Sequence, residues 1–505
     1  MFAESQNRKT TILRVQRPHL RLSSTFLGSR TVRAWRACFL RTSSLMLSEN
    51  SGEERRVPVR RPRCLVLLAF EALSIGTVAE HAFALRDFSE HDVELVHIGT
   101  LNWLNFDLGR FDVIVFHYSI VIARGYHIRP ALRERLAGLR ALKVLFIQDE
   151  YRWIDATAEA IREFGISVIF TVLNRDIVDK VYHHEWLRSV RKEITLTGFV
   201  DESLLGRAVP NYTERRVDVA YRGRTLPYWL GSFAMEKLRI GERFREAATK
   251  FGLSHDISSD EGARIYGGRW IEFVAGAKAI LGTESGASVF DFTGEIRSRV
   301  DQAVNSTPQI GFEAIRRDLL EEIDGKIVVH VISPRIFEAA ALKTLMINYP
   351  GEYSGRLTPW RHYVPLARDH SNVDEVIGVI RNSEQAQRII EAAYREVACN
   401  PENSFRAMAA HFDRVVREEL CLGEVLYTVP RKIGFRILAS RRLEVLSWVD
   451  SYARRRGGKF FRWAWRMVEP ILPVPAQRWI KGIIVGQPGT REGIPTRSSA
   501  ASRPL

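Results

Sequence analysis

The sequence predicts an α/β protein in which two doubly wound parallel sheets face a cleft. Short, almost wholly apolar runs alternate with segments of helical spacing, a pattern typical of βαβ units whose strands are covered on both faces. The chain has 505 residues, 46% of them hydrophobic, which suffices for two or three domains with cores of their own. A polar break that contains Pro210 divides the pattern into two series.

The first series predicts one parallel sheet with helices on both faces. Its apolar runs predict strands at 63–70, 92–99, 112–119, 143–150, 167–173 and 193–199. Its helical spacing predicts helices at 71–88, 129–142, 156–165 and 175–187.

The second series predicts another sheet of the same kind. Strands are expected at 217–223, 279–283, 344–349 and 362–366, with helices at 234–252, 270–277, 334–342, 373–397 and 403–420. In open parallel sheets the carboxyl ends of the strands form the ligand crevice, so loops from both halves should point into the cleft.

Charge separates the two ends of the chain from its body. Residues 1–63 carry 14 basic and 4 acidic residues and 425–505 carry 16 and 4, whereas 64–424 carry 44 and 51. This acidic body argues against a nucleic-acid groove, so no nucleic-acid partner is expected. The predicted parts are a disordered basic extension at 1–60, domains at 61–210 and 211–424, a basic aromatic region at 425–485 and a disordered tail at 486–505.

The amino-terminal extension leaves two interpretations open. No acidic residue lies between Ser5 and Ser48, while arginine and serine recur, as they do in organelle transit peptides. Alternatively, translation starts at Met46 and the preceding residues are absent from the protein.

The basic aromatic region also leaves two interpretations open. Cations surround four tryptophans there: Trp448, Trp463, Trp465 and Trp479. This composition favours contact with an anionic membrane surface. The alternative is packing on the protein's own acidic body.

The expected location is the cytoplasm, peripheral to the inner face of the membrane if the basic region binds lipid. No apolar run approaches the roughly 20 residues that cross a bilayer. The four cysteines lie far apart and form no CxxC pair, which fits a reducing compartment.

Common catalytic motifs are absent from the sequence. There is no GxxxxGK[ST] loop, no HExxH, no GxSxG, no GxGxxG after the first strand and no Asp-x-Asp pair. Nucleotide hydrolases, zinc peptidases, ordinary esterases, simple dehydrogenases and metal-dependent sugar transferases of the single-sheet type are therefore disfavoured.

One segment resembles a known family. SPRIFEAAALKTLMINYPGEYSGRLTPWRHYVPL at 333–366 is similar to the carboxyl-half signature of two-domain GT-B glycosyltransferases, in the group-1 and spore-maturation-type branch. DHSNVDEVIGVIRNSEQAQRIIEAAYREV after it, FDVIVFH ending at His117 and AYRGR ending at Arg224 are similar to further parts of that family. The resemblance implies two Rossmann-like domains, the first for the acceptor and the second for a nucleotide sugar.

The resemblance also implies roles for residues of the second domain. Glu338 would accept the hydroxyls of a ribose, and Arg335 would lie beside the diphosphate. Arg224 and Lys237 would neutralise the leaving diphosphate in place of a metal, although the spacing between them is longer here than in the family. The alternatives are a glutamate that pairs with the helix dipole at position 338 and a surface ion pair at position 335.

In the first domain, His117 would contact the sugar or the acceptor, and its alternative is a structural histidine. Asp149 and Glu150 end a predicted strand, where carboxylates can remove the acceptor proton or cap a loop. The family often carries two glutamates eight positions apart, and the position expected for the first is not acidic here. Glu284, in the turn-rich segment 284–295, is the proposed replacement, which leaves open whether transfer retains or inverts the anomeric configuration.

The sequence thus predicts a metal-independent, hexosyltransferase-like enzyme without a cofactor. It would move a sugar from a nucleotide diphosphate donor to a hydroxyl of a glycan or lipid-linked acceptor, as in polysaccharide biosynthesis. The alternatives are a non-catalytic sugar- or nucleotide-binding protein and a nucleotide-sugar epimerase on the same fold.

Overall fold

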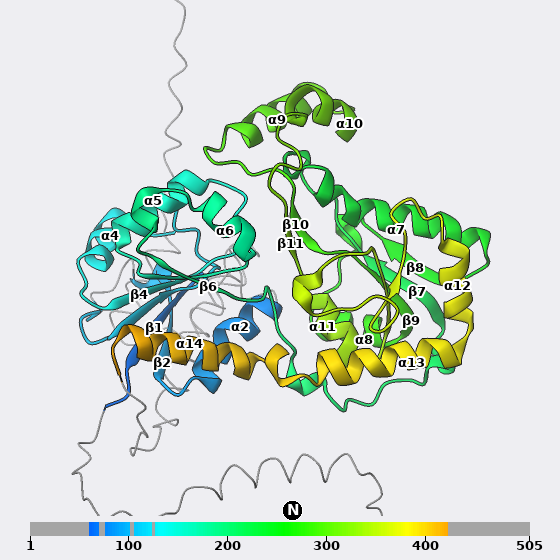
Figure 1. Ribbon diagram of the computed structural model, residues 1–505, viewed down its shortest axis with the longest axis horizontal. Helices are drawn as coiled ribbons and strands as arrows, with labels where there is room; N and C mark the ends of the chain where they lie inside the picture. Colours follow the sequence, from blue (N-terminus) through cyan, green and yellow to red (C-terminus); the bar gives the residue numbers. More distant parts are fainter. Residues whose placement is uncertain (1–59, 70–75, 102–105, 124–126, 423–505) are drawn as a thin grey trace, which may run out of the picture. The chain divides into compact units, whose positions relative to one another are not determined.

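The computed structural model describes residues 60–69, 76–101, 106–123 and 127–422. This part of the chain is an α/β protein with two parallel sheets, which confirms the predicted fold class (Figure 1). The predicted extension at 1–60, apart from its last residue, and the regions 425–485 and 486–505 lie outside the described residues. The boundary between the predicted domains at 210 stays a prediction.

The first sheet has six parallel strands in the order β2-β1-β3-β4-β5-β6. Their bounds are β1 (Arg63–Leu68), β2 (Asp92–His97), β3 (Val113–Phe116), β4 (Leu142–Phe146), β5 (Val168–Thr171) and β6 (Arg191–Ile194). Cys64 pairs with Val93 of β2 and with Val113 of β3, which sets the register around β1. The central strands are almost wholly buried, as their apolar sequences require.

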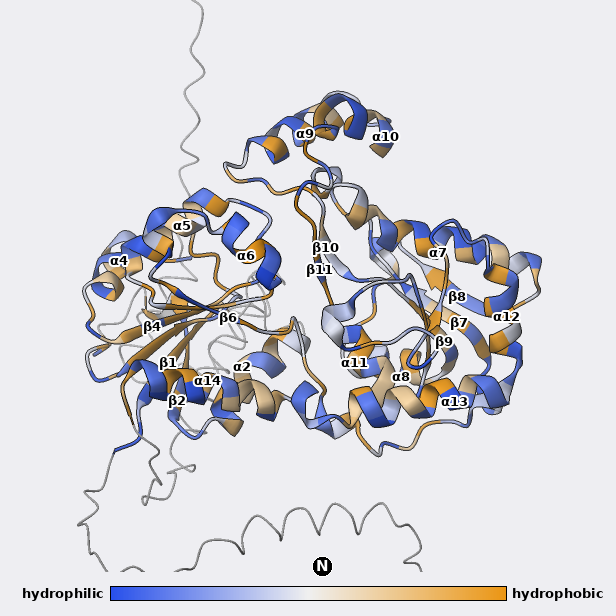
Figure 2. Ribbon diagram, in the orientation of Figure 1, coloured by the Kyte–Doolittle hydropathy of each residue, from blue (hydrophilic) through white to orange (hydrophobic). Residues whose placement is uncertain are grey.

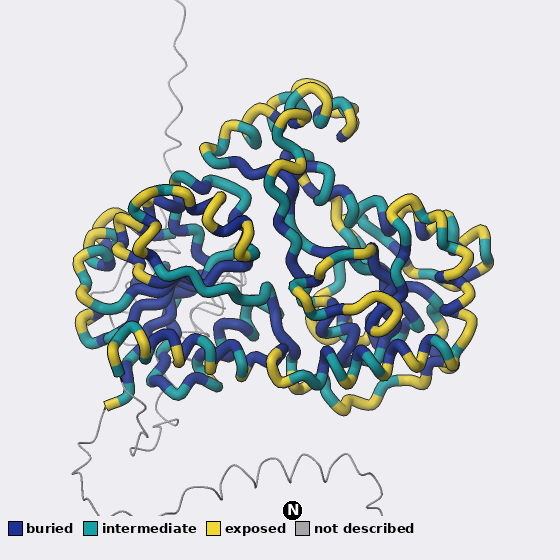
Figure 3. The backbone as a smooth tube through the Cα atoms, in the orientation of Figure 1, coloured by how far each residue is buried: buried dark blue, intermediate teal, exposed yellow. Residues whose placement is uncertain are grey.

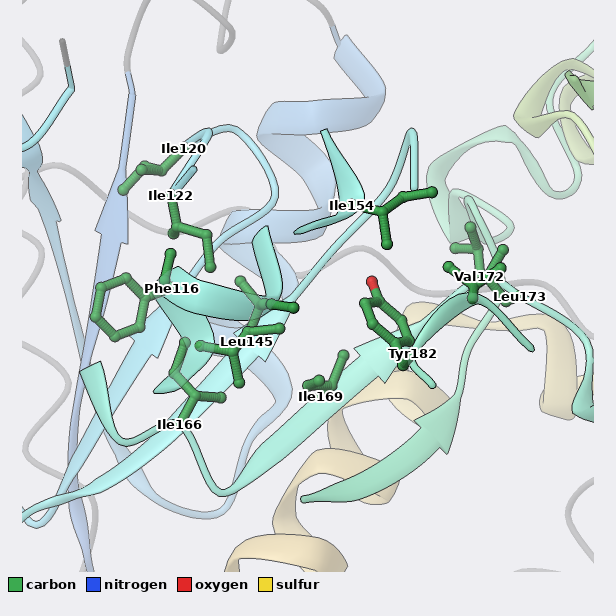
Figure 4. Close-up of a cluster of buried hydrophobic side chains, with 14 of the residues drawn as sticks. Phe116, Ile120, Ile122, Leu145, Ile154, Ile166, Ile169, Val172, Leu173 and Tyr182 are labelled. Atoms are coloured by element: carbon green, nitrogen blue, oxygen red, sulfur yellow. The ribbon is translucent and has the colours of Figure 1, made fainter. Parts of the chain in front are cut away.

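Alternate residues of these strands enter two separate cores. Leu67 and Phe116 belong to the core on one face, part of which Figure 4 shows around Leu145 and Ile169. Val66 belongs to the core on the other face. Burial on both faces follows from the two-residue period of a strand.

Helices cover both faces of this sheet. They are α2 (Gly76–Phe88), α3 (Ile98–Leu101), α4 (Pro130–Ala137), α5 (Ile154–Phe164) and α6 (Arg175–Val181). Pro130 opens α4, and Gly165 ends α5 in the left-handed conformation that glycine adopts freely. Helix α14 (Phe405–Glu419) follows the second sheet in the sequence but packs on the first, beside α2 (Figure 1).

The second sheet has five parallel strands in the order β13-β12-β9-β7-β8. Their bounds are β7 (Val217–Arg222), β8 (His255–Ser258), β9 (Ala277–Gly282), β12 (Leu345–Asn348) and β13 (Val364–Pro365). The helices around it are α7 (Ser232–Lys250), α8 (Gly268–Ala275), α11 (Pro334–Ala341), α12 (Val373–Arg381) and α13 (Ser383–Ala393). The inner strands of both sheets are apolar in Figure 2 and buried in Figure 3, whereas each helix has apolar, buried residues on one side and polar, exposed residues on the other.

The structure differs from the sequence-based expectations in several places. The polar segment HDIS forms the edge strand β8, which the search for apolar runs missed. The single helix predicted at 373–397 is broken at Asn382, whose side chain caps α13 by accepting from the backbone N–H of Gln385 at 3.1 Å. The strand predicted at 193–199 ends earlier, at Ile194.

The segment predicted as a loop at 284–295 also differs, because it begins with strand β10 (Ser285–Ala287). This strand pairs antiparallel with β11 (Val329–Val331), and the chain between them forms α9 (Glu295–Ser306) and α10 (Phe312–Ile315). The close approach requires glycine at 286, since its φ is +146° and a Cβ there would lie 1.8 Å from the Val329 carbonyl oxygen.

Candidate active site

Each sheet has a point at which its strand order reverses. In the first sheet the reversal lies between β1 and β3, and in the second it lies between β7 and β9. Ligands of doubly wound sheets bind at the carboxyl ends of the strands near such points. The structure has a cavity at this edge of each sheet.

The cavity of the second sheet measures ≈ 280 Å³. It lies at the carboxyl ends of β7, β9 and β12 and beside the amino end of α11, where backbone N–H groups and the helix dipole favour an anion. The charged residues of its lining that the structure describes are all cationic: Arg222, Arg224, Lys237, Arg264 and Arg335. The lining therefore suits an anionic ligand.

Three of these cations have no partner of opposite charge in the described part of the chain. Arg224 is exposed and makes no hydrogen bond or ion pair with the described residues. Lys237 Nζ donates to Ser285 Oγ at 2.9 Å, and Arg335 stacks at 4.8 Å over the ring of Trp270 and donates to a backbone carbonyl. Burial, and then Arg335 and Arg224, lower the pKa of Lys237 to about 8. A bound anion would relieve this repulsion.

The other two cations have structural partners. Arg222 donates to Asp256 Oδ1 at 2.8 Å and stacks at 4.4 Å over Phe273. Arg264 pairs with Glu261. Both therefore form the wall of the cavity and leave the first three to meet a ligand.

Glu338 lies on α11, one turn after Arg335. Pro334 opens this helix. Trp270 Nε1 donates to Glu338 Oε2 at 2.6 Å, while Oε1 accepts no hydrogen bond from the described residues. Burial raises the pKa of Glu338, against the opposing effects of this hydrogen bond and of Arg335. The carboxylate can thus accept a ligand hydroxyl through Oε1, next to the cationic cavity.

Glu80, on α2, gives a prediction about pH. Burial, then Asp201, then Glu338 raise the pKa of Glu80 from 4.5 to about 7. Because the folded protein holds this proton more tightly than the unfolded chain, stability should fall as the pH rises from about 4.5 to 7. Glu80→Gln should therefore stabilise the protein by about 1–2 kcal/mol at pH 8, allowing for partial exposure, and by almost nothing at pH 4.5.

Urea unfolding at the two pH values tests this prediction. Glu134→Gln, at an exposed position of α4, is the control and should change stability at neither pH. An equal effect of Glu80→Gln at both values would contradict the raised pKa.

The cavity of the first sheet measures ≈ 320 Å³ and lies at the carboxyl ends of β3 and β4. Asp149 stands at its exposed rim with φ of +57°, and accepts from the Tyr151 hydroxyl at 2.7 Å and from Arg152 at 3.1 Å. A non-glycine residue with positive φ is uncommon and costs about 1–3 kcal/mol where the fold imposes it. The loop thus presents this carboxylate at a fixed place.

Glu150 also lines this cavity but is buried. It accepts from Thr171 Oγ1 and from the Tyr182 hydroxyl, both at 2.6 Å, and from the Val172 backbone N–H at 3.1 Å. Burial raises the pKa of Glu150 to about 7, even though all three hydrogen bonds favour the ionised form. Figure 4 shows the Tyr182 hydroxyl among apolar side chains. The carboxylate therefore holds together the strand ends that form the cavity.

His117 is fully buried at the end of β3. Its Nε2 lies 3.1 Å from His81 Nδ1, and its Nδ1 accepts from the Ser119 backbone N–H at 3.1 Å. Burial, and then His81, lower the pKa of His117, which keeps the ring neutral. The structure thus places His117 behind the cavity wall with both nitrogens engaged, and a contact with substrate stays a prediction.

Electrostatics connect the rim of the first cavity with the cations of the second. The Asp149 charge raises the pKa of Lys237, in opposition to the larger effects of burial, Arg335 and Arg224. The Arg224 charge in turn lowers the pKa of Tyr151, in opposition to the larger effect of burial. Three of the predicted site residues, Arg224, Lys237 and Arg335, thus line one cavity, and Asp149 at the rim of the other acts electrostatically on Lys237.

Glu284 does not line the cationic cavity, although Lys237 donates to the adjacent Ser285 at 2.9 Å. It is buried, accepts from the Tyr353 backbone N–H at 2.6 Å and lies 3.7 Å from His330 Nδ1. Burial raises its pKa, and the hydrogen bond from the Tyr353 backbone opposes this. A Cβ at Gly351 would lie 2.3 Å from its Oε2. Glu284 thus packs against the 351–353 loop and accepts a hydrogen bond from its backbone. A role of Glu284 in catalysis stays a prediction.

Sequence reasoning missed two residues of the site. Trp270 orients Glu338, and nothing in the sequence around it indicates that role. Asn348 lines the cationic cavity, and a polar residue at the end of an otherwise apolar strand was a usable signal.

The described residues contain no group of three or more His, Cys, Asp or Glu side chains that could hold a metal ion. Among them, every helix is too short or too polar to cross a bilayer.

No family model matches the sequence, and no curated protein matches it. Among solved structures, the chain is similar to an alpha-glucosyltransferase in complex with UDP-glucose and DNA containing an abasic site, with a TM-score of 0.44 and 10% identity over 70% of this chain and 99% of that one. It is also similar to Anabaena HepE in complex with UDP-glucose, with a TM-score of 0.42 and 8% identity over 71% and 99%. TarM gives a TM-score of 0.34 and 9% identity over 62% and 55%. At this distance only the residues of this chain can indicate what it does.

Proposed function

We propose that the protein transfers a sugar from a nucleoside diphosphate sugar to a hydroxyl group, without using a metal ion. The observation that supports this most directly is the group of Arg224, Lys237 and Arg335 on one cavity, three cations that have no carboxylate partner among the residues the structure describes. The cavity lies at a switch point and a helix amino end, both of which favour phosphate groups. The resemblance of 333–366 to GT-B glycosyltransferases supports the same conclusion.

The donor end of the reaction needs charge stabilisation. When the bond between the anomeric carbon and the diphosphate oxygen breaks, negative charge grows on the leaving diphosphate. Arg335 offers a planar pair of donors, and Lys237 offers a point charge that a bound diphosphate would keep protonated. Fixed cations that meet developing charge give one of the largest contributions to catalysis. Glu338 would hold the ribose hydroxyls through its open Oε1.

The acceptor end would use the first sheet. Asp149 is exposed at the rim of that cavity and acts electrostatically on Lys237, so a hydroxyl bound there would lie near the donor. Asp149 would accept the hydroxyl proton as the new bond forms. Glu150 would keep the cavity in shape. A glycan or lipid-linked acceptor, polysaccharide biosynthesis and membrane contact through 425–485 are parts of the proposal that this site leaves to experiment.

Nucleotide binding is the first test. Calorimetric titration with UDP, GDP and dTDP should show binding of at least one, and Glu338→Ala should weaken that binding about tenfold, since a hydrogen bond to a charged group is lost. Glu375→Ala, at an exposed position of α12, is the matched control and should bind like the wild type. Binding of none of the three would contradict the proposal.

Turnover separates the three candidate functions. Slow release of the nucleoside diphosphate from one sugar nucleotide in the absence of acceptor would support transfer. Conversion into a second sugar nucleotide without such release would support an epimerase. Tight binding with neither reaction, even with glycan acceptors present, would support a binding protein.

A further inference from the structure

Asn348 has an unusual environment for a buried amide. It ends β12 and its side chain is fully buried, yet neither Oδ1 nor Nδ2 has a hydrogen-bond partner among the described residues. Its backbone is satisfied, because its carbonyl accepts from the Leu366 N–H at 2.9 Å. An unpaired buried polar group costs about 1–3 kcal/mol, so native proteins keep very few without a reason.

The position of Asn348 supplies such a reason, since it lines the cationic cavity together with Lys237 and Arg335. A glycine faces it on the neighbouring strand: a Cβ at Gly282 would lie 2.4 Å from Asn348 Oδ1. The amide is thus held between strand ends at the cavity, where a ligand could satisfy it and no group of the described part of the chain does.

The chemistry of an amide narrows the ligand group. Diphosphate oxygens accept hydrogen bonds only, so they could pair with Nδ2 but would leave Oδ1 unpaired. A group that both donates and accepts is needed, and sugar hydroxyls and the edge of a nucleobase are such groups. Tyr266, 51% exposed and also part of the cavity lining, offers the flat aromatic face on which a base would stack. The ribose hydroxyls are already assigned to Glu338.

We infer that Asn348 binds hydroxyls of the transferred sugar and so selects the donor sugar. This inference rests on the proposed function. The base would lie at Tyr266, the diphosphate at the cations and the sugar at Asn348, all along one cavity. Asn348 would then be a specificity residue whose amide is left unpaired in the free protein in order to recognise the glycosyl group.

A comparison of paired ligands tests the inference. Calorimetry would measure the Kd of the wild type and of Asn348→Leu for UDP and UDP-glucose, GDP and GDP-mannose, and dTDP and dTDP-glucose. For the pair that binds, Asn348→Leu should raise the Kd of the sugar nucleotide about tenfold and the Kd of the free nucleotide less than twofold. Because the variant removes an unpaired polar group, its ligand-free melting temperature should equal or exceed that of the wild type.

Asn403→Leu is the matched control, because Asn403 is another buried amide with an unpaired oxygen but lies outside the cavity lining. It should leave both affinities unchanged. Asn348→Ala should show the same split and serves if the leucine variant fails to fold. If Asn348→Leu weakened the binding of both ligands of a pair equally, or weakened the binding of neither ligand, the assignment of Asn348 to the sugar would be overturned. If the wild type bound none of the six ligands, the proposed function would be overturned and this inference with it.

Discussion

Replacing Lys237 with methionine should lower kcat/KM for sugar transfer by roughly 100- to 1,000-fold, the loss expected when one fixed donor to a developing oxyanion is removed. The physical reason is the position of Nζ on the anion-binding cavity, within electrostatic reach of Arg224 and Arg335. Methionine keeps an unbranched stem of similar length, so packing along α7 should be retained. Initial rates at saturating and limiting donor would measure the change.

The effect should fall mainly on kcat. A leaving diphosphate gains charge in the transition state, so a cation there acts more strongly on the transition state than on the bound donor. Arg239→Met is the matched control on the same helix, since Arg239 pairs with Glu313 at 2.7 Å and lies outside the cavity lining. Wild-type kcat in the Lys237→Met variant would contradict the assignment of the cavity.

A pH profile gives an independent check on the same residue. Because the pKa of Lys237 is lowered to about 8 in the free protein, the fraction that carries a proton falls above that pH. The value of kcat/KM, which reports on the free enzyme, should therefore decline above about pH 8 in the wild type. The decline should be absent from the residual activity of Lys237→Met.

The sequence predicted both sheets because their strands are buried on two faces. The β1 segment RCLVLL has apolar residues on both sides of the strand. Such a strand is stable only in a sheet that is covered on both faces. The edge strand β8 escaped detection for the opposite reason. At the sheet edge, His255 and Asp256 are less buried than residues of the inner strands. The sequence of β8 is therefore polar and does not form an apolar run.

The cations of the site were predictable because they belong to short segments directly after strands or at a helix start. Arg224 follows β7 and Arg335 opens α11, so local order along the chain already places them at the carboxyl edge of the sheet. Lys237 stands in the helix that follows β7, and the structure places it on the same cavity despite the long spacing.

The surroundings of the other candidates depend on residues distant in sequence. His117 directly follows strand β3, which ends at Phe116, and a histidine from α2, His81, occupies one of its ring nitrogens. Glu284 accepts from the Tyr353 backbone, in a loop 69 residues later in the sequence. The sequence pattern contains no information about these contacts with distant residues. It could therefore place His117 and Glu284 at an edge of a sheet, but it could not show whether they line a cavity.

Arg215 holds together the opposite, amino-terminal edge of the second sheet. Its guanidinium is buried and donates to the Ala277 carbonyl at 2.8 Å, to Thr344 Oγ1 at 3.0 Å and to the Pro210 carbonyl at 3.1 Å. Burial lowers its pKa, and among the described residues no carboxylate forms an ion pair with it. Ala277 begins β9 and Thr344 precedes β12, so one side chain fixes the start of both strands that end at the cavity.

Arg215→Met should therefore lower the free energy of unfolding by about 3 kcal/mol, since buried acceptors on two strands lose their donors together. Arg215→Lys should recover only part of this, because an ammonium group cannot spread its donors over several acceptors as a guanidinium does. Urea unfolding measures the change, and Arg216→Met, at the exposed neighbouring position, should alter stability by less than about 0.5 kcal/mol. If Arg215→Met were as stable as that control, the hydrogen bonds to β9 and β12 would contribute nothing to the fold. If instead it is destabilised and nucleotide affinity falls with it, the alignment of the two strand starts is what positions Gly282 and Asn348 at the far ends of the same strands.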